Sequence, residues 1–329
     1  MINFIIRRLG VSLISLFIGT FIVFSIIQLP PGDYVDFVIG KMTASSGEGE
    51  QVGKIARQLR EYYGLDKPFL VRYFQWVGGL LRGNLGFSLL YRRPVVEVIA
   101  SELFWTIVVV GASFAFSWFF GIAIGIYSAV KQYSIGDHIF TLFGFMGISI
   151  PNFFLAMLLI YLMIQLRTGV NLGLFSSRFV DAPWSWAKFI DLLKHLWMPV
   201  VAVGTARLAG VIRIMRGNLL DVLGQPYVNT ARSKGLREFY VIVKHAARNA
   251  INPLISLAGM QASRLLSGMV VTAVVLNLPI IGPTFLSALN SQDMFLAGAY
   301  LLVSIVLLLL GNLVADLMLA WSDPRIRYD

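Results

Sequence analysis

Long runs of apolar residues constrain this chain more than any other feature of its sequence. A helix needs about 20 consecutive apolar residues to cross the hydrocarbon core of a bilayer. Six runs of this size are present, and two of them are interrupted only by arginine: residues 9–29, 103–130, 139–166, 196–215, 250–278 and 294–315. The runs are too long for barrel strands and show no alternation of apolar and polar residues. The sequence therefore predicts an all-α membrane protein with six transmembrane helices.

The composition indicates that the solvent of this chain is largely lipid. Of its 329 residues, 57% are hydrophobic and 13% are charged, and the mean hydropathy is +0.75. A soluble core cannot absorb so much apolar surface. The net charge of +10 does not indicate nucleic-acid binding, because the basic residues lie in short segments that flank the apolar runs. The absence of cysteine excludes disulfides and thiolate metal sites.

The distribution of lysine and arginine predicts the orientation in the membrane. Six spans place both termini on one side, and the basic residues of the termini, of the second loop and of residues 216–250 all fall on that side. By the positive-inside rule this side is cytoplasmic. The first loop is also basic, but it is long enough to be largely exempt. We therefore expect an N-terminal segment with the first span (1–30), an extracytoplasmic loop with interfacial helices (31–102) and a core with five spans (103–329).

Residues 216–250 form a basic island, punctuated by proline and glycine, between two apolar runs. Pro226 suits the first turn of a helix, and Gly235 predicts that this helix ends at Lys234 in a left-handed turn. A second helix is predicted from Leu236, because apolar residues recur with helical spacing at Leu236, Phe239, Tyr240, Val243 and Ala247. The simpler alternative is a solvated loop that obeys the positive-inside rule. A solvated loop needs neither the proline, nor the glycine, nor the apolar stripe.

The island carries a specific resemblance. It contains Thr-Ala-Arg-Ser-Lys-Gly at residues 230–235 and His-Ala-Ala-Arg-Asn-Ala at residues 245–250, followed by Pro253. This pattern resembles the EAA-type cytoplasmic loop of permease subunits in bacterial ATP-binding-cassette importers, in the oligopeptide/dipeptide/nickel branch. Further segments are similar to that branch in the same order along nearly the whole chain: residues 5–9, 29–33, 64–68, 83–86, 149–153, 221–224 and 323–327.

The resemblance implies a type I importer permease with both termini cytoplasmic, in a prokaryotic inner membrane. Its implied partners are a second, homologous permease, two cytoplasmic ATPase subunits and an extracytoplasmic solute-binding protein. The chain itself is expected to be non-catalytic and to bind no cofactor, since ATP and Mg²⁺ belong on the ATPases. The resemblance makes the first island helix the coupling helix, with ATPase-coupling residues Tyr227, Thr230, Ala231, Arg232, Lys234, Gly235 and Arg237. Arg232 and Lys234 offer charge-assisted contacts, and Tyr227 and Val228 suit an apolar groove.

The chain departs from the branch in two respects. The branch usually carries a glutamate and a glycine where this chain has Ala273 and Ile280, so any role of that acid does not transfer. Conversely, Arg207 and Arg264 lie within predicted spans, where a buried cation costs a few kcal/mol unless it faces water or an anion. We hypothesise that both line the substrate path and attract anionic groups such as a peptide carboxylate. The alternative is that they snorkel or bond to carbonyls and acids of neighbouring spans, such as Asp316.

Other features of the sequence are interpreted as structural. His138, His195 and His245 are scattered across loops and span ends and predict no metal cluster. Gly121 and Gly125, in the second span, predict close helix packing. No phosphate-binding Gly-x-x-x-x-Gly-Lys-Ser/Thr motif is present, so the chain cannot hydrolyse ATP by that route.

Alternative functions leave different signatures. A secondary transporter predicts paired intramembrane acids or broken helices in both halves, and intramembrane acids are missing apart from Asp316 near the end of the last span. An intramembrane enzyme predicts clustered catalytic groups, and none appears in the runs. Within the importer reading, di- and oligopeptides are the first choice of substrate and oligosaccharides the main rival. The low charge of the spans, with no His or Met cluster, argues mildly against nickel.

Overall fold

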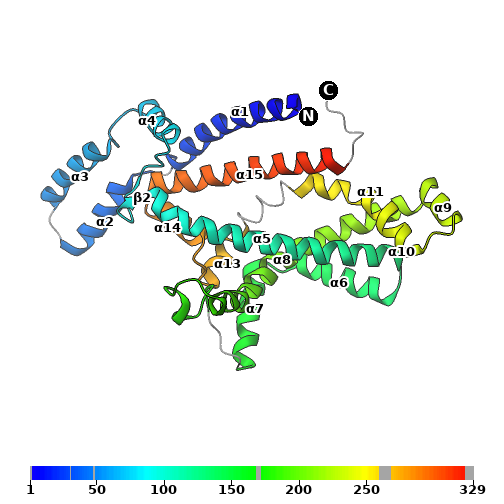
Figure 1. The fold of residues 1–329 in the computed structure, drawn as a ribbon. Helices are drawn as coiled ribbons and strands as arrows, with labels where there is room; N and C mark the ends of the chain where they lie inside the picture. The colour runs from blue at the N-terminus through cyan, green and yellow to red at the C-terminus, as the bar shows by residue number, and fades with distance from the viewer. Residues whose placement is uncertain (1, 30, 47–48, 168–171, 259–267, 323–329) are drawn as a thin grey trace. The chain divides into compact units, whose positions relative to one another are not determined.

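The computed structural model describes residues 2–29, 31–46, 49–167, 172–258 and 268–322. Helices make up most of this structure (Figure 1). The N-terminal helices are α1 (Ile2–Ile27), α2 (Tyr34–Ser46), α3 (Gly49–Tyr63) and α4 (Phe69–Leu81). The middle of the chain contains α5 (Val95–Val130), α6 (Ile135–Ser149), α7 (Asn152–Gln165), the 3-10 turn η1 (Ser177–Phe179) and α8 (Trp186–Leu223). The remaining helices are α9 (Pro226–Ser233), α10 (Glu238–Tyr240), the π-helix η2 (Val241–Ala247), α11 (Arg248–Ala250), α13 (Val270–Val275), α14 (Ile281–Asn290) and α15 (Met294–Ser322).

Four of the predicted spans are long apolar helices. Within the described residues, those long and apolar enough to cross a membrane are Ile6–Ile27 of α1, the whole of α5, the whole of α8, and Met294–Leu317 of α15. The fifth predicted span, 250–278, includes residues 259–267, which lie outside the described residues. On either side of them, residues 252–258 and α13 are helical. The described residues therefore contain four helices that are long and apolar enough to cross a membrane, or five if the pair α6 and α7 counts as one span.

The third predicted span, 139–166, differs from the straight helix expected. Helices α6 and α7 are bent by 108° relative to each other at the break between Ser149 and Asn152. Pro151 explains the break, because proline has no N–H to donate and disfavours the helical conformation in the residue before it. Ile150 is accordingly extended, with φ −92° and ψ 121°.

The chain forms two compact units. The first contains Met1–Phe104 and Ile280–Leu307, and the second contains Trp105–Pro279 and Leu308–Asp329. In the first unit, α4 packs against α1 through a buried cluster of Val23, Phe24, Tyr73 and Trp76. A hydrogen bond of 3.1 Å joins Thr20 Oγ1 and the Tyr73 hydroxyl inside this cluster. Part of the aromatic content of the predicted outer loop is thus used to hold α4 on α1.

A buried carboxylate organises the start of α15 in the same unit. Two short strands, β1 (Phe87–Ser88) and β2 (Arg93–Pro94), pair antiparallel just before α5. Asp293 is fully buried and accepts hydrogen bonds from Ser88 Oγ at 2.7 Å and from the Leu90 amide at 3.0 Å. It also accepts from the Leu296 amide at 3.2 Å, which caps α15. One side chain therefore fixes the hairpin to the helix.

The second unit depends on a close approach between α5 and α8. A Cβ atom added at Gly121 would lie 2.6 Å from Val211 Cγ1, and one at Gly125 would lie 2.7 Å from Met215 Cβ. Ser117 Oγ also donates to the Gly204 carbonyl across the interface at 2.8 Å. Small residues let helix backbones approach closely in membranes, so the packing role predicted for Gly121 and Gly125 is confirmed.

We expect Gly125→Val to destabilise the protein by about 1–3 kcal/mol, because the new side chain overlaps Met215 on α8. The measurement is the thermal stability of the purified protein in detergent. The matched control is Gly111→Val on the same helix, where an added Cβ meets no atom within 4 Å. Equal stability of the two variants would contradict the close packing described here.

Candidate functional site

The basic island begins where α8 ends, and its first helix has the predicted ends. Gln225 is extended, and Pro226 starts α9 at the position where its missing N–H is not needed. The helix runs to Ser233, Lys234 caps it, and Gly235 follows with φ +74°. This conformation favours glycine because it has no side chain to clash with the backbone. Figure 1 shows α9 beyond the end of α8, at the extremity of this unit.

One face of α9 is anchored to the second unit. Val228 is fully buried and Ala231 is buried with it, in a cluster that includes Leu219 of α8 and Val241 of η2. The expectation that Val228 would reach into a partner's groove is therefore wrong, because this side chain already fills the chain's own core. Ala231 likewise acts as an anchor and offers no surface to a partner.

The other face of α9 is exposed and partly ordered by polar contacts. Asn249 Nδ2 donates to the Tyr227 hydroxyl at 2.8 Å, which holds the tyrosine against α11. Among the predicted coupling residues, the exposed ones are Tyr227, Thr230, Arg232, Lys234, Gly235 and Arg237. Six of the seven predicted residues are thus accessible, and we call this set, on α9 and in the turn after it, the α9 face.

Arg232 is already paired with a residue that the sequence reasoning missed. Its Nη2 donates to Glu238 Oε1 at 2.8 Å, and its Nε lies 3.2 Å from both carboxylate oxygens. Hydrogen bonds from Arg232 hold the pKa of Glu238 below its ordinary value of 4.5. A carboxyl whose pKa is depressed by folding contributes stability above its ordinary pKa and loses it as the pH falls through the lowered value. The ion pair between Arg232 and Glu238 is therefore intact at neutral pH, and it bridges the turn at Gly235 between α9 and α10.

The second island helix differs from the regular amphipathic helix expected. Helix α10 is one turn long and continues as the π-helix η2 and then as α11. The π geometry brings residues five apart onto one face, so the buried residues are Val241, Ile242, Ala246 and Ala247. Of the predicted stripe, only Ala247 is buried, and Phe239 is 78% exposed. The predicted stripe is wrong because it assumed a period of 3.6 residues.

A further anchor joins α6 to the cytoplasmic end expected for α8. Asp137 is buried and accepts two hydrogen bonds from Arg216, at 2.9 Å and 3.1 Å. The spacing of Ser134 and Asp137 is a helix-start signal, and Ser134 indeed caps α6. That signal identifies the beginning of a helix, but not an ion pair with a residue 79 positions away.

The structure describes one of the two arginines hypothesised for a substrate path. Arg207 is half-buried in α8. Arg264 lies outside the described residues. A cavity of about 560 Å³ between α6 and α8 is lined by other cationic side chains, those of Arg213 and Arg216, and by His138. Arg207 is not among the residues that line it.

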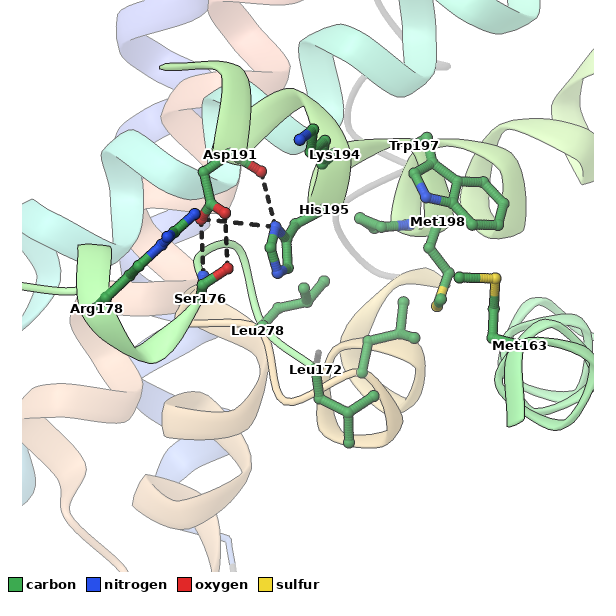
Figure 2. A pocket seen from close by; sticks show the side chains of 13 residues that line it. Met163, Leu172, Ser176, Arg178, Asp191, Lys194, His195, Trp197, Met198 and Leu278 are labelled. Carbon is green, nitrogen blue, oxygen red and sulfur yellow. Dashed lines mark hydrogen bonds and ion pairs between the residues drawn. The ribbon is translucent and has the colours of Figure 1, made fainter. Parts of the chain in front are cut away.

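A second cavity, of about 310 Å³, lies near the start of α8 (Figure 2). Its polar side is built by Asp191, which accepts from the Ser176 amide at 2.7 Å and from Ser176 Oγ at 2.6 Å. His195 lines the same cavity, and its Nδ1 lies 2.7 Å from the Asp191 carbonyl oxygen. The sequence does not indicate that His195 lines a cavity, because the segments that form this cavity are far apart in the chain.

The long apolar helices are those of a multi-pass membrane protein, and α9, after the last turn of α8, has one face packed on the core and one face exposed. Two family models match the sequence. That of the binding-protein-dependent transport system inner membrane component matches residues 121–328, and that of the N-terminal part of such membrane components matches residues 1–110.

Relatives of known name are similar over the full length of the chain. The oligopeptide transport system permease protein AppB of Bacillus subtilis is 33% identical over 329 residues, covering 100% of both chains. The dipeptide transport system permease protein DppB of Escherichia coli is 34% identical over 348 residues, covering 100% of this chain and 99% of its own. The glutathione transport system permease protein GsiC of Escherichia coli is 32% identical over 328 residues, with full coverage of both chains.

The chain therefore belongs to the family of inner membrane components of binding-protein-dependent transport systems. It is a multi-pass permease subunit of an ATP-binding-cassette importer in the bacterial inner membrane. Such a subunit is not catalytic, because ATP hydrolysis takes place on separate ATPase subunits. The family also implies a partner solute-binding protein.

We expect Val228→Asp to detach α9 from the second unit, because an unpaired carboxylate costs several kcal/mol in an apolar core. Each 1.4 kcal/mol raises the detached population about tenfold, so trypsin should cut after Lys234 at least tenfold faster in the purified protein. Thr230→Asp places the same charge on the exposed side of α9 and should leave the rate near that of the parent. An unchanged rate for Val228→Asp would show that α9 is not held by this contact.

Proposed function

We propose that this chain is one of two homologous permease subunits that together form the translocation path for di- and oligopeptides. Peptide cargo is supported by full-length relatives named as oligopeptide and dipeptide permeases, at 33% and 34% identity. The cargo is delivered by the solute-binding protein on the outer side. The second permease is a separate copy or a homologue that completes the path.

The proposed topology has six spans with both termini in the cytoplasm. Its support is the four long apolar helices, the bent pair α6 and α7, and the basic residues that gather at the termini and in the island. In this topology α9 and Gly235 face the cytoplasm. Residues 31–102 and the segment between α7 and α8 face outward.

The observation that carries the coupling proposal is the division of α9 into an anchored face and an exposed face. Val228 and Ala231 fix the helix to the second unit, so a force applied to α9 is transmitted to α8. The exposed face presents Tyr227, Lys234 and Arg237 to a groove on one ATPase subunit. ATP and Mg²⁺ bind on the ATPases in this scheme, and this chain binds no cofactor. Closure of the ATPases then moves α9 as a lever and tilts the spans between outward and inward openings.

The substrate path includes Arg207 and Arg264 in this proposal. Cations within a membrane span are retained where they face water or an anion. The half-burial of Arg207 is compatible with a position beside a polar path. Both residues would attract the carboxylate that every unmodified peptide carries.

The coupling proposal can be tested by cross-linking, because the chain contains no cysteine and any introduced thiol is unique. We expect Ser233→Cys, on the exposed side of α9, to form a cross-link to an ATPase subunit in the assembled importer when a short reagent is added that joins a thiol to a lysine amine. Tyr62→Cys is the control, since Tyr62 is 82% exposed but lies in the segment proposed to face outward. It should react with an impermeant maleimide from outside the cell and form no such cross-link. The reverse pattern would overturn both the orientation and the docking surface.

Neutral replacement of the two path arginines tests their role. We expect Arg207→Gln and Arg264→Gln to lower peptide uptake about tenfold, corresponding to about 1.4 kcal/mol of lost attraction. The measurement is uptake by proteoliposomes containing the complete importer, with ATPase activity recorded in parallel. Arg213→Gln is the matched control on α8, because Arg213 is exposed. Uptake and substrate preference unchanged from the parent would refute the path assignment.

A further inference from the structure

The cavity of Figure 2 lies at the opposite end of α8 from the island. His195 is 29 residues before Gly224, which is roughly 43 Å along a helix at 1.5 Å per residue. A bilayer with its headgroups is about 40–45 Å thick. In the proposed topology this cavity is therefore on the outer side, where the solute-binding protein releases its cargo. Its walls come from α7, from the segment that contains Ser176, from the first turns of α8, and from Leu276 and Leu278 after α13.

His195 gives the cavity an unused hydrogen-bonding atom. The side chain is buried, with 8% of the residue exposed. Its Nδ1 must carry the hydrogen, because the Asp191 carbonyl at 2.7 Å can only accept. Nε2 of the neutral ring is therefore an acceptor, and it has no partner among the described residues. Figure 2 shows this nitrogen pointing away from Asp191, toward Leu278.

A buried acceptor without a hydrogen bond destabilises a folded protein, because it loses its bonds to water and gains none in return. Pro199, one turn later, leaves a second acceptor without its helical partner, because it has no N–H to donate to the His195 carbonyl. A ligand that brings an N–H group would satisfy the site.

The surroundings of His195 combine a cationic rim with an apolar floor. Arg178 and Lys194 line the cavity and are exposed, and Asp191 is the one lining carboxylate, with both oxygens accepting from Ser176. Two cations against one anion leave the lining with a net positive charge. The floor is formed by aliphatic and thioether side chains, those of Leu172, Met198, Leu276 and Leu278. The site thus offers positive charge at its edge, one acceptor inside, and an apolar surface below.

We propose that this cavity binds the carboxyl-terminal residue of the transported peptide. The α-carboxylate lies at Arg178 and Lys194, the N–H of the last peptide bond donates to His195 Nε2, and an apolar terminal side chain packs on Leu172 and Leu278. This proposal rests on the proposed function in peptide import. It adds to that function a receiving site on the permease and a preference for peptides that end in an apolar residue.

The size of the cavity restricts what it holds. Ligand pockets are usually about 300–1,000 Å³, so 310 Å³ suits one end of a peptide and leaves the rest outside. A sugar would leave the apolar floor unmatched. A cationic ligand would meet the like charges of Arg178 and Lys194. A free carboxylate joined to an apolar side chain and an N–H matches all three features.

The test uses Trp197→Cys, a unique thiol on the cavity wall at a position 39% exposed in the parent and outside the proposed contacts. In the assembled importer in nanodiscs, we expect the dipeptide Ala-Leu to slow maleimide labelling of this thiol. Ala-leucinamide and Ala-Lys should protect at least fivefold less well, because one lacks the carboxylate and the other the apolar side chain. Trp184→Cys, 59% exposed and not lining the cavity, should label at a rate that no peptide changes.

Two further substitutions assign the contacts. His195→Asn retains a donor for the Asp191 carbonyl but lacks Nε2, so half-protection should need about fivefold more Ala-Leu. Arg178→Gln, at an exposed position, should weaken protection by Ala-Leu while leaving that by Ala-leucinamide unchanged. Uptake of Ala-Leu is measured on the same variants of the complete importer in proteoliposomes. Uptake without protection, or equal protection by acid and amide, would overturn the site and leave the proposed function standing. No uptake of Ala-Leu by the parent importer, together with no protection of Trp197→Cys, would overturn both.

Discussion

The close contact of α8 with its neighbours is the constraint on which the second unit depends. Gly121 and Gly125 of α5 leave no space for a side chain against α8, and a Cβ at Gly147 of α6 would lie 3.0 Å from the Thr205 carbonyl oxygen. Lipid supplies little hydrophobic force between helices, so such packing and the bond from Ser117 to Gly204 carry the association. The pair of Asp137 and Arg216 closes the same interface at one end. Helix α8 is therefore held by its neighbours between Gly204 and Arg216.

In the proposed coupling mechanism, this packing allows α9 to act on α8. A docking helix transmits force only if it is fixed to what must move, and Val228 and Ala231 fix α9 to the core that contains Leu219 of α8. The pair of Arg232 and Glu238 and the bond from Asn249 to Tyr227 order the exposed side chains before any partner arrives. Preordered side chains lose less conformational entropy on binding. Because Arg232 is paired with Glu238, the net positive charge of the α9 face comes from Lys234 and Arg237.

The sequence predicted those features that depend on local chemistry. Apolar length alone identified four membrane helices, and Pro226 and Gly235 fixed both ends of α9. Predictions failed where distant residues or an unusual helix decide the outcome. The composition of η2 does not indicate a π-helix. Val228 is buried because Leu219 and Val241 form the core that it packs against. Arg216 pairs with Asp137, which is 79 residues away in the sequence. The cavity at His195 collects segments from residue 163 to residue 278, which no local pattern links.

The geometry of α8 also connects the two ends of the proposed mechanism. In that mechanism, ATPase closure displaces α9, and α8 transmits the displacement because its sides are close-packed and cannot absorb it. A tilt of about 5° over a length of roughly 43 Å moves the far end by roughly 4 Å. Asp191, His195 and Met198 lie on that end, whereas Leu276 and Leu278 belong to another segment of the cavity wall. A displacement of this size changes the distance across a cavity of about 310 Å³ substantially. Pro199 leaves the His195 carbonyl without an N–H partner in the helix, in the turn that lies beside that cavity. In the proposed mechanism, α8 therefore connects the island, where the ATPases act, to the site proposed to hold the peptide. The affinity of that site for the peptide would then depend on the state of the ATPases.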